Sequence, residues 1–124
     1  MPKRILDVGQ CNPDYSAISQ FLHAHFDVEI DRSHLLSDSL EKLRANSYDL
    51  VLINRKLDKD YSDGMRILET IKSDDHLKHI PVMIISNYPD AQAAAVAAGA
   101  EPGFGKAELT DLRSVEKVRA VIGD

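Results

Sequence analysis

Four short apolar runs, separated by longer segments of helical period, constrain this sequence more than any other feature. The runs are Arg4 to Val8, Val28 to Ile30, Leu50 to Ile53 and Val82 to Ile85. Each is rich in leucine, isoleucine or valine without strict alternation, which is typical of strands buried on both faces of a sheet. Strands that alternate with helices predict a parallel sheet covered on both sides.

The segments between these runs repeat apolar residues three and four positions apart, which predicts helices with one buried stripe each. Asn12 is expected to cap the first helix before Pro13, and Pro89 to open an alanine-rich helix that ends near Gly99. Thr110 is expected to cap the last helix. The stripes are Ile18, Phe21, Leu22, His25 and Phe26; Leu36, Leu40 and Leu43; Gly64, Ile67, Leu68 and Ile71; and Leu112, Val115, Val118 and Ile122.

A fifth strand is predicted over Glu101 to Gly105, although this segment contains a proline and two glycines. With it, five strand–helix units predict an α/β fold with a doubly wound five-stranded parallel sheet and helices on both faces. A chain of 124 residues is long enough for one domain, which we expect to span residues 1–124.

The composition excludes some classes of binding partner and indicates the cellular compartment. Twenty acidic and 15 basic residues give a formal charge of −5, which opposes direct binding to nucleic acid or to an anionic membrane. The lone Cys11 cannot form an internal disulfide, and no spaced set of metal ligands is present in the sequence. No apolar stretch approaches the length of a membrane span, so a cytoplasmic location is predicted.

In a doubly wound sheet, ligands bind beyond the carboxyl ends of the strands. The residues there are Gly9 to Asn12, Asn54 to Asp58, Ser86 to Tyr88 and Gly105 to Ala107. Any function of this chain is therefore expected to depend on these four segments.

Four stretches in these positions carry a family resemblance: Lys3 to Leu6, Tyr48 to Asn54, His79 to Ser86, and Ala98 to Lys106. In order and spacing they resemble the receiver domain of two-component response regulators, the CheY-like superfamily, over essentially the whole chain. The resemblance implies a flavodoxin-like sheet with strand order 2-1-3-4-5. It also implies a role in two-component or phosphorelay signal transduction.

The resemblance places Lys106 at the family's lysine, Ser86 at its hydroxyl, and Asn54 at its phosphoacceptor aspartate. Gly9 and Gln10 then stand at the family's acidic pair, so three carboxylates are replaced and the formal charge of this set is +1 instead of −2. An amide is a poor nucleophile for phosphoryl transfer, and Mg²⁺ prefers carboxylate ligands. The chain is thus predicted to be an atypical receiver, with a degenerate phosphorylation pocket, no bound metal ion and no cofactor.

Gly103 corresponds to the aromatic switch position of the family, with Phe104 beside it, so the usual side-chain switch is not expected. Ala107 replaces a proline of the family, and the loop from Asn54 to Gly64 is about two residues longer than usual.

Several interpretations of nearby side chains stay open. Lys106 could close the pocket by donating to the side-chain oxygen of Asn54, or the pocket could accept a small anion. Asp7 could be a hydrogen-bonded residue at the strand end, or a partner for Lys106. The remaining polar residues are interpreted as solvated or capping groups and not as phosphoacceptors or zinc ligands: Asp58, Asp60, Asp63, His76 and His79.

The predicted function is a phosphorylation-independent protein-interaction module, and not an enzyme. The resemblance implies a partner surface made by Ala91 to Ala98, Pro102 to Gly105 and Asp111 to Ile122, which would bind a signalling protein or a second copy of the chain. One alternative is a response regulator that is phosphorylated on a non-standard acceptor. The other is a small doubly wound domain that binds an anion or another ligand.

Overall fold

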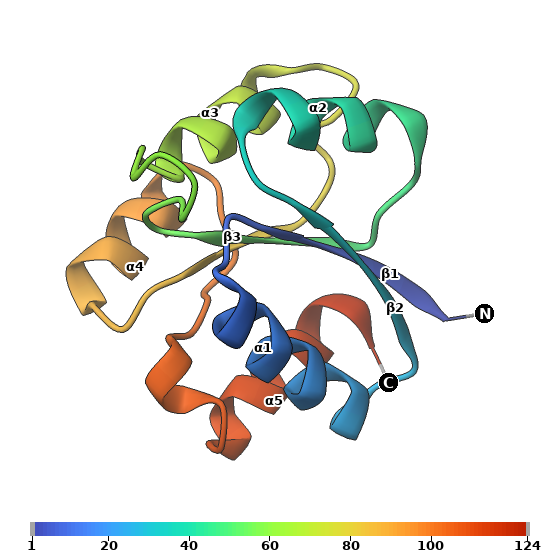
Figure 1. The fold of residues 1–124 in the computed structure, drawn as a ribbon, viewed down its shortest axis with the longest axis vertical. Helices are drawn as coiled ribbons and strands as arrows, with labels where there is room; N and C mark the ends of the chain where they lie inside the picture. Colours follow the sequence, from blue (N-terminus) through green and yellow to red (C-terminus); the bar gives the residue numbers. More distant parts are fainter. Residues whose placement is uncertain (1, 124) are drawn as a thin grey trace.

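The computed structural model describes residues 2–123 and places a four-stranded parallel sheet between helices (Figure 1). The strands are β1 (Lys3–Val8), β2 (Val28–Ser33), β3 (Leu50–Asn54) and β4 (Val82–Ile85). The helices are α1 (Asn12–His25), α2 (Leu36–Ala45), α3 (Met65–Ser73), α4 (Pro89–Ala97) and α5 (Leu112–Ile122), with a short 3₁₀ helix, η1 (Lys106–Glu108), before α5.

The strands lie in the order β2-β1-β3-β4, and all three neighbouring pairs are parallel. In β1, Leu6 is aligned with Asp31 of β2 on one side and with Val51 of β3 on the other. The prediction of an α/β, flavodoxin-like fold with a parallel sheet and helices on both faces is confirmed.

The pleat of β1 divides its side chains between two cores. Leu6 and Val8 join the cluster with residues of α2 and α3, whereas Ile5 joins the cluster with residues of α1 and α5. Figure 1 shows these two pairs of helices on opposite sides of the sheet. Since side chains alternate along a strand, Asp7 lies on the face covered by α1 and α5.

The predicted fifth strand was wrong. Within the described part of the chain, the segment Glu101–Gly105 forms only an isolated bridge to β4 through Glu101. In that bridge the Glu101 N–H donates to the Val82 carbonyl at 2.8 Å. The side chain of Gln92 then takes the place of the next strand contacts, because its Nε2 donates to the Ile84 carbonyl at 2.8 Å and its Oε1 accepts the Gly103 N–H at 2.9 Å.

The predicted helix caps were each displaced by one residue. Cys11, not Asn12, stands at the N-cap of α1. Asp111, not Thr110, caps α5, and its side chain accepts the backbone N–H two residues further on at 2.9 Å. His25, at the end of the predicted α1 stripe, is exposed. No helix among residues 2–123 combines the length and apolar character needed to cross a membrane.

Strand β2 continues to Ser33, three residues beyond the predicted end at Ile30. Its polar end is held by side chains, because Asp31 accepts hydrogen bonds from Arg4 Nη2 at 2.8 Å and from the Tyr48 hydroxyl at 2.6 Å. An apolar run could not predict this extension.

Candidate functional site

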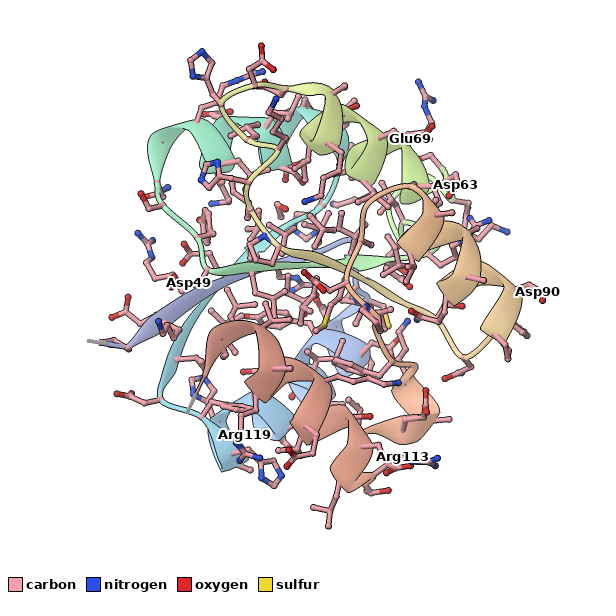
Figure 2. The ribbon with its side chains drawn as sticks, turned by 180° about the vertical axis from the view of Figure 1, so that it is seen from behind. Asp49, Asp63, Glu69, Asp90, Arg113 and Arg119 are labelled. Atoms are coloured by element: carbon pink, nitrogen blue, oxygen red, sulfur yellow. The ribbon has the colours of Figure 1, made fainter. Side chains whose placement is uncertain are left out.

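A pocket of about 500 Å³ opens at the carboxyl edge of the sheet. Figure 2 shows Asp63, in the loop before α3, and Asp90, on α4, at this side of the molecule, opposite Asp49, which precedes β3. The pocket is lined by Asn54, Arg55, Lys56, Tyr61, Asp63, Ile85, Ser86, Asn87, Tyr88 and Lys106. Three residues of the predicted site, from three separate segments, therefore share one cavity.

Gly9 contributes to this site only through its backbone. Its φ of +79° lies in the left-handed region, and a Cβ there would collide with the side chain of Leu57. The Gly9 carbonyl accepts the Asp58 N–H at 3.0 Å, which fixes the loop after β3 against the end of β1. A side chain at position 9 is thus disfavoured by the backbone conformation and by contact with Leu57.

Asn54 ends β3 and is half-buried. Its Nδ2 donates to the Gly9 carbonyl at 3.1 Å, so the amide links the ends of β3 and β1. The side chain predicted to replace the phosphoacceptor therefore acts as a hydrogen-bond donor to the backbone, a role that an ionised carboxylate cannot fill.

Lys106 does not donate to Asn54, so that expectation was wrong. Its Nζ forms an ion pair with Asp14 Oδ2, in the first turn of α1, at 2.7 Å. The Lys106 ammonium holds the pKa of the Asp14 carboxyl below its ordinary value. Asp14 was missed in the sequence, although an acidic residue in the first turn of a helix that starts at this edge was a usable signal.

Asp14 also changes the charge of the site. Added to the five predicted residues, it cancels the single positive charge of Lys106. The pocket nevertheless keeps a positive excess, because Arg55 and Lys56 also line it and Asp63 is the one carboxylate in its lining.

Asp7 and Gln10 lie buried beneath this edge, and each has no exposed surface. Within the described residues, neither side chain has a hydrogen bond of good geometry at any of its polar atoms. Asp7 stands next to the last residue of β1, with the Gln10 amide close to its carboxyl. The alternative, in which Asp7 pairs with Lys106, was wrong, because Lys106 pairs with Asp14.

Burial raises the pKa of Asp7 to about 7, since an ionised carboxyl is poorly solvated there. The approach of the Gln10 amide and the charges of Arg32 and Lys106 oppose this rise, and Asp14 adds to it. Burial outweighs these groups, so Asp7 is largely protonated below neutral pH.

The hydroxyl of Ser86 is used locally, because its Oγ accepts the Tyr88 N–H at 3.2 Å where α4 begins. At Gly103, which the sequence predicts to stand at the family's switch position, a Cβ would collide with the Ile84 carbonyl oxygen. Phe104 is fully buried and packs on Phe21 with ring centroids 5.5 Å apart. Neither residue presents an aromatic side chain that could rotate between core and surface.

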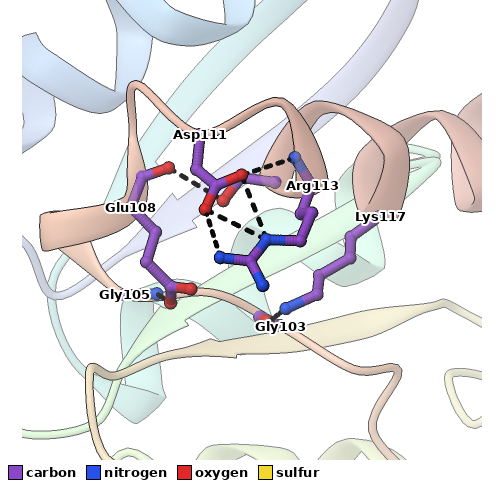
Figure 3. Close-up of polar contacts among 7 residues, drawn as sticks. Gly103, Gly105, Glu108, Asp111, Arg113 and Lys117 are labelled. Carbon is purple, nitrogen blue, oxygen red and sulfur yellow. Dashed lines mark hydrogen bonds and ion pairs between the residues drawn. The ribbon is translucent and has the colours of Figure 1, made fainter.

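Side-chain contacts fix the segment that carries Lys106 (Figure 3). Lys117 Nζ donates to the Gly103 carbonyl at 3.0 Å, and Glu108 Oε1 accepts the Gly105 N–H at 2.9 Å. On the other side, Asn87 Oδ1 accepts the Ala107 N–H at 3.0 Å. Lys106 is consequently held at the pocket wall from both directions.

The other polar candidates have local roles. Asp60 Oδ1 accepts the Ser62 N–H at 2.9 Å, and Asp63 Oδ1 accepts the Met65 N–H at 2.9 Å, at the start of α3. His76 and His79 line a different pocket, between the loops that precede β3 and β4. Within residues 2–123, no group of three or more His, Cys, Asp or Glu side chains is placed to hold a metal ion.

No protein-family profile matches the chain, and a comparison with curated proteins found no match either. Solved structures do match. The signal receiver domain of a DNA-binding response regulator from Colwellia psychrerythraea is 26% identical, with a TM-score of 0.76 and coverage of 95% of this chain and 98% of that one.

Two further matches have the same fold. The phosphorylated cyanobacterial phytochrome response regulator RcpA is 25% identical, with a TM-score of 0.75 and coverage of 98% of this chain and 94% of that one. A CheY-like receiver domain protein from Methanospirillum hungatei is 21% identical, with a TM-score of 0.76 and coverage of 97% and 93%.

The sheet order and the pocket at its carboxyl edge define a flavodoxin-like α/β protein. Among proteins of that class, the structural neighbours of this chain are response regulator receiver domains of the CheY-like type. The resemblance of the sequence to this family is thus supported at the level of the fold.

Proposed function

We propose that this chain is an atypical receiver domain in two-component or phosphorelay signalling, which recruits a partner without being phosphorylated and catalyses no reaction. The fold and its structural neighbours support the receiver class. The observation that carries the proposal is the hydrogen bond from Asn54 Nδ2 to the Gly9 carbonyl.

Transfer of a phosphoryl group to a receiver needs a carboxylate oxygen as nucleophile. The Asn54 side chain is a neutral amide whose nitrogen already donates a hydrogen bond to the Gly9 carbonyl. An acyl phosphate at this position is therefore not expected.

The groups that would hold a magnesium ion are also changed. Gly9 has no side chain, and Gln10 is turned into the interior with no exposed surface. Asp14, the nearest replacement carboxylate, is already paired with Lys106. Mg²⁺ keeps near-octahedral oxygen coordination and binds through one or two carboxylates, so this edge is expected to have little affinity for it.

Intact-mass measurement after incubation with acetyl phosphate and Mg²⁺ tests the proposal. We expect no stoichiometric gain of a phosphoryl group, and a receiver domain with the full acidic set serves as the positive control. A gain of one phosphoryl group would contradict the proposal. Repeating the reaction with Asp58→Asn, Asp60→Asn and Asp63→Asn would then identify the non-standard acceptor.

The proposed partner surface is made by α4, Pro102 and α5, since Gly103, Phe104 and Gly105 of the predicted segment are buried. On α4, the outer residues Ala93, Ala94 and Ala97 are exposed, and the Val96 side chain is 45% exposed. This face is apolar and small, so another helix could pack closely on it and bury surface that water now covers.

Val96→Glu tests this surface, and Ala17→Glu, at an exposed site on α1, is the matched control. We expect Val96→Glu to abolish binding of the signalling partner, or dimerisation of the chain as measured by light scattering. We expect Ala17→Glu to keep it. Equal binding by both variants would contradict the assignment of the surface to α4.

A further inference from the structure

We propose that the pocket at the carboxyl edge binds a small aromatic anion, a ring that carries a carboxylate or phosphate group. The proposal deepens the proposed function and rests on it in one respect, since both require a pocket free of covalent phosphate. It assigns a ligand to a cavity whose phosphoryl chemistry is expected to be lost.

The pocket has the size and charge for such a ligand. Its volume of about 500 Å³ lies within the range of small-molecule sites. Three cationic side chains line it against one carboxylate, Asp63. Lys106 and Arg55 have partners in Asp14 and Asp63, at 2.7 and 2.5 Å.

Lys56 supplies a cation that is open to a ligand. Its ammonium lies 5.8 Å from the centre of the Tyr61 ring, and within the described residues no carboxylate forms an ion pair with it. Arg55 adds a second positive charge to the pocket lining, with its Nη1 paired to Asp63. An incoming anion would meet the Lys56 ammonium without breaking an ion pair.

Two tyrosines line the pocket and face solvent. The Tyr61 and Tyr88 side chains are each 72% exposed, although burying an aromatic ring is strongly favourable. They belong to separate segments, the loop after β3 and the loop before α4. A ring placed between them would make aromatic contacts while its charged group meets Lys56 and Arg55.

The backbone of Tyr61 adopts an unfavourable conformation. Its φ of +60° makes it the one non-glycine residue in the left-handed region among residues 2–123. The conformation is held by the loop, because the Tyr61 N–H donates to the Leu57 carbonyl at 2.8 Å and the Leu57 N–H to the Ser62 carbonyl at 2.9 Å. Such strain is typically retained where a residue has a functional role.

The rest of the pocket lining is neutral. Ile85, at the end of β4, lies beneath the pocket and is 1% exposed. Asn54, Ser86 and Asn87 are neutral polar side chains. A purely inorganic anion would meet the cations but leave both tyrosine rings in water.

Titration of the ¹⁵N-labelled chain with three probes, followed by NMR, tests the proposal. The probes are phenyl phosphate, inorganic phosphate and phenol. We expect phenyl phosphate to bind about ten-fold more tightly than either of the others, since it alone gains both ring and charge contacts. Its chemical-shift changes should centre on the pocket residues.

Two matched pairs of variants locate the site. Lys56→Ala and Tyr88→Ala should each weaken phenyl phosphate binding by about five-fold, consistent with one lost cation or ring contact. Lys59→Ala, in the same loop, and Leu112→Ala, an exposed apolar side chain on α5, should leave it unchanged. All four sites are exposed, so folding is expected to be kept, and the spectra report it directly.

Equal affinities for phenyl phosphate and inorganic phosphate would overturn the proposal, as would shifts that centre elsewhere or no binding. The intact mass recorded after a separate incubation with acetyl phosphate and Mg²⁺ separates the two proposals. An unchanged mass with no binding refutes the aromatic-anion site alone, whereas a phosphoryl gain refutes the proposed function.

Discussion

The buried carboxyl of Asp7 should make the stability of the native chain fall as the pH rises from 5 to 8, and Asp7→Asn should remove that fall. Asparagine has nearly the same shape and stays neutral, so it keeps the packing beneath the pocket. It also retains a polar group beside Gln10, which is likewise buried.

The sign follows from the direction of the pKa shift. Burial raises the pKa of Asp7 from 3.8 in the unfolded chain to about 7 in the folded one. The folded state therefore holds the proton more tightly, and this stability is fully present below pH 3.8 and is lost as the pH rises through 7. With about 1.4 kcal/mol per unit, the loss between pH 5 and 8 is about 3 kcal/mol.

Urea unfolding followed by circular dichroism at pH 5, 6, 7 and 8 measures this change. The quantity to compare is the difference in free energy of unfolding between the native chain and Asp7→Asn at each pH. Taking the difference cancels the other titrating groups, which both proteins share. Asp58→Asn, which removes an exposed carboxyl from the loop after β3, is the control.

We expect the free energy of unfolding of Asp7→Asn to rise relative to that of the native chain by about 3 kcal/mol between pH 5 and 8. Unfolding free energies of the two proteins that stay parallel over this range would refute the reasoning. In that case Asp7 would be ionised in the folded state at pH 5, with a partner that offsets its burial.

Three glycine substitutions test the close contacts of the site. Gly103→Ala should destabilise the fold by about 1–3 kcal/mol in urea, because its Cβ meets the Ile84 carbonyl oxygen and backbone cannot yield cheaply. Gly9→Ala should cost more than Gly123→Ala, since both have φ near +80° but only Gly9 also meets Leu57. Equal thermal stability of the last two variants would contradict the contact with Leu57.

The sequence was sufficient to predict where the strands of the sheet lie, wherever those strands are buried. Val82–Ile85 was predicted with both ends correct, because an apolar run between turns is a local signal. The segment after Glu101 was wrongly predicted to be a strand. Its conformation depends on Gln92 of α4, whose side chain forms hydrogen bonds both to Ile84 of β4 and to Gly103. A contact between distant parts of the chain has no local signature.

The same distinction applies to the site. Asn54, Ser86 and Lys106 could be placed in one pocket because strand ends converge at one edge of a parallel sheet. The partner of Lys106 could not be predicted, since it depends on where the first turn of α1 brings Asp14. Arg55 and Lys56 lie in the segment Asn54 to Asp58 that was expected at this edge, but their role in the pocket lining depends on the fold of the loop after β3.

Titration of the ¹⁵N-labelled native chain with Mn²⁺ tests most directly whether the carboxyl edge can hold the divalent cation that receiver chemistry requires. Bound Mn²⁺ broadens the amide signals of nearby residues. We expect no selective broadening of Gly9, Asn54 or Ser86 when Mn²⁺ is added, and only diffuse effects at exposed carboxylates. Loss of these three signals at low Mn²⁺, reversed by excess Mg²⁺, would contradict it.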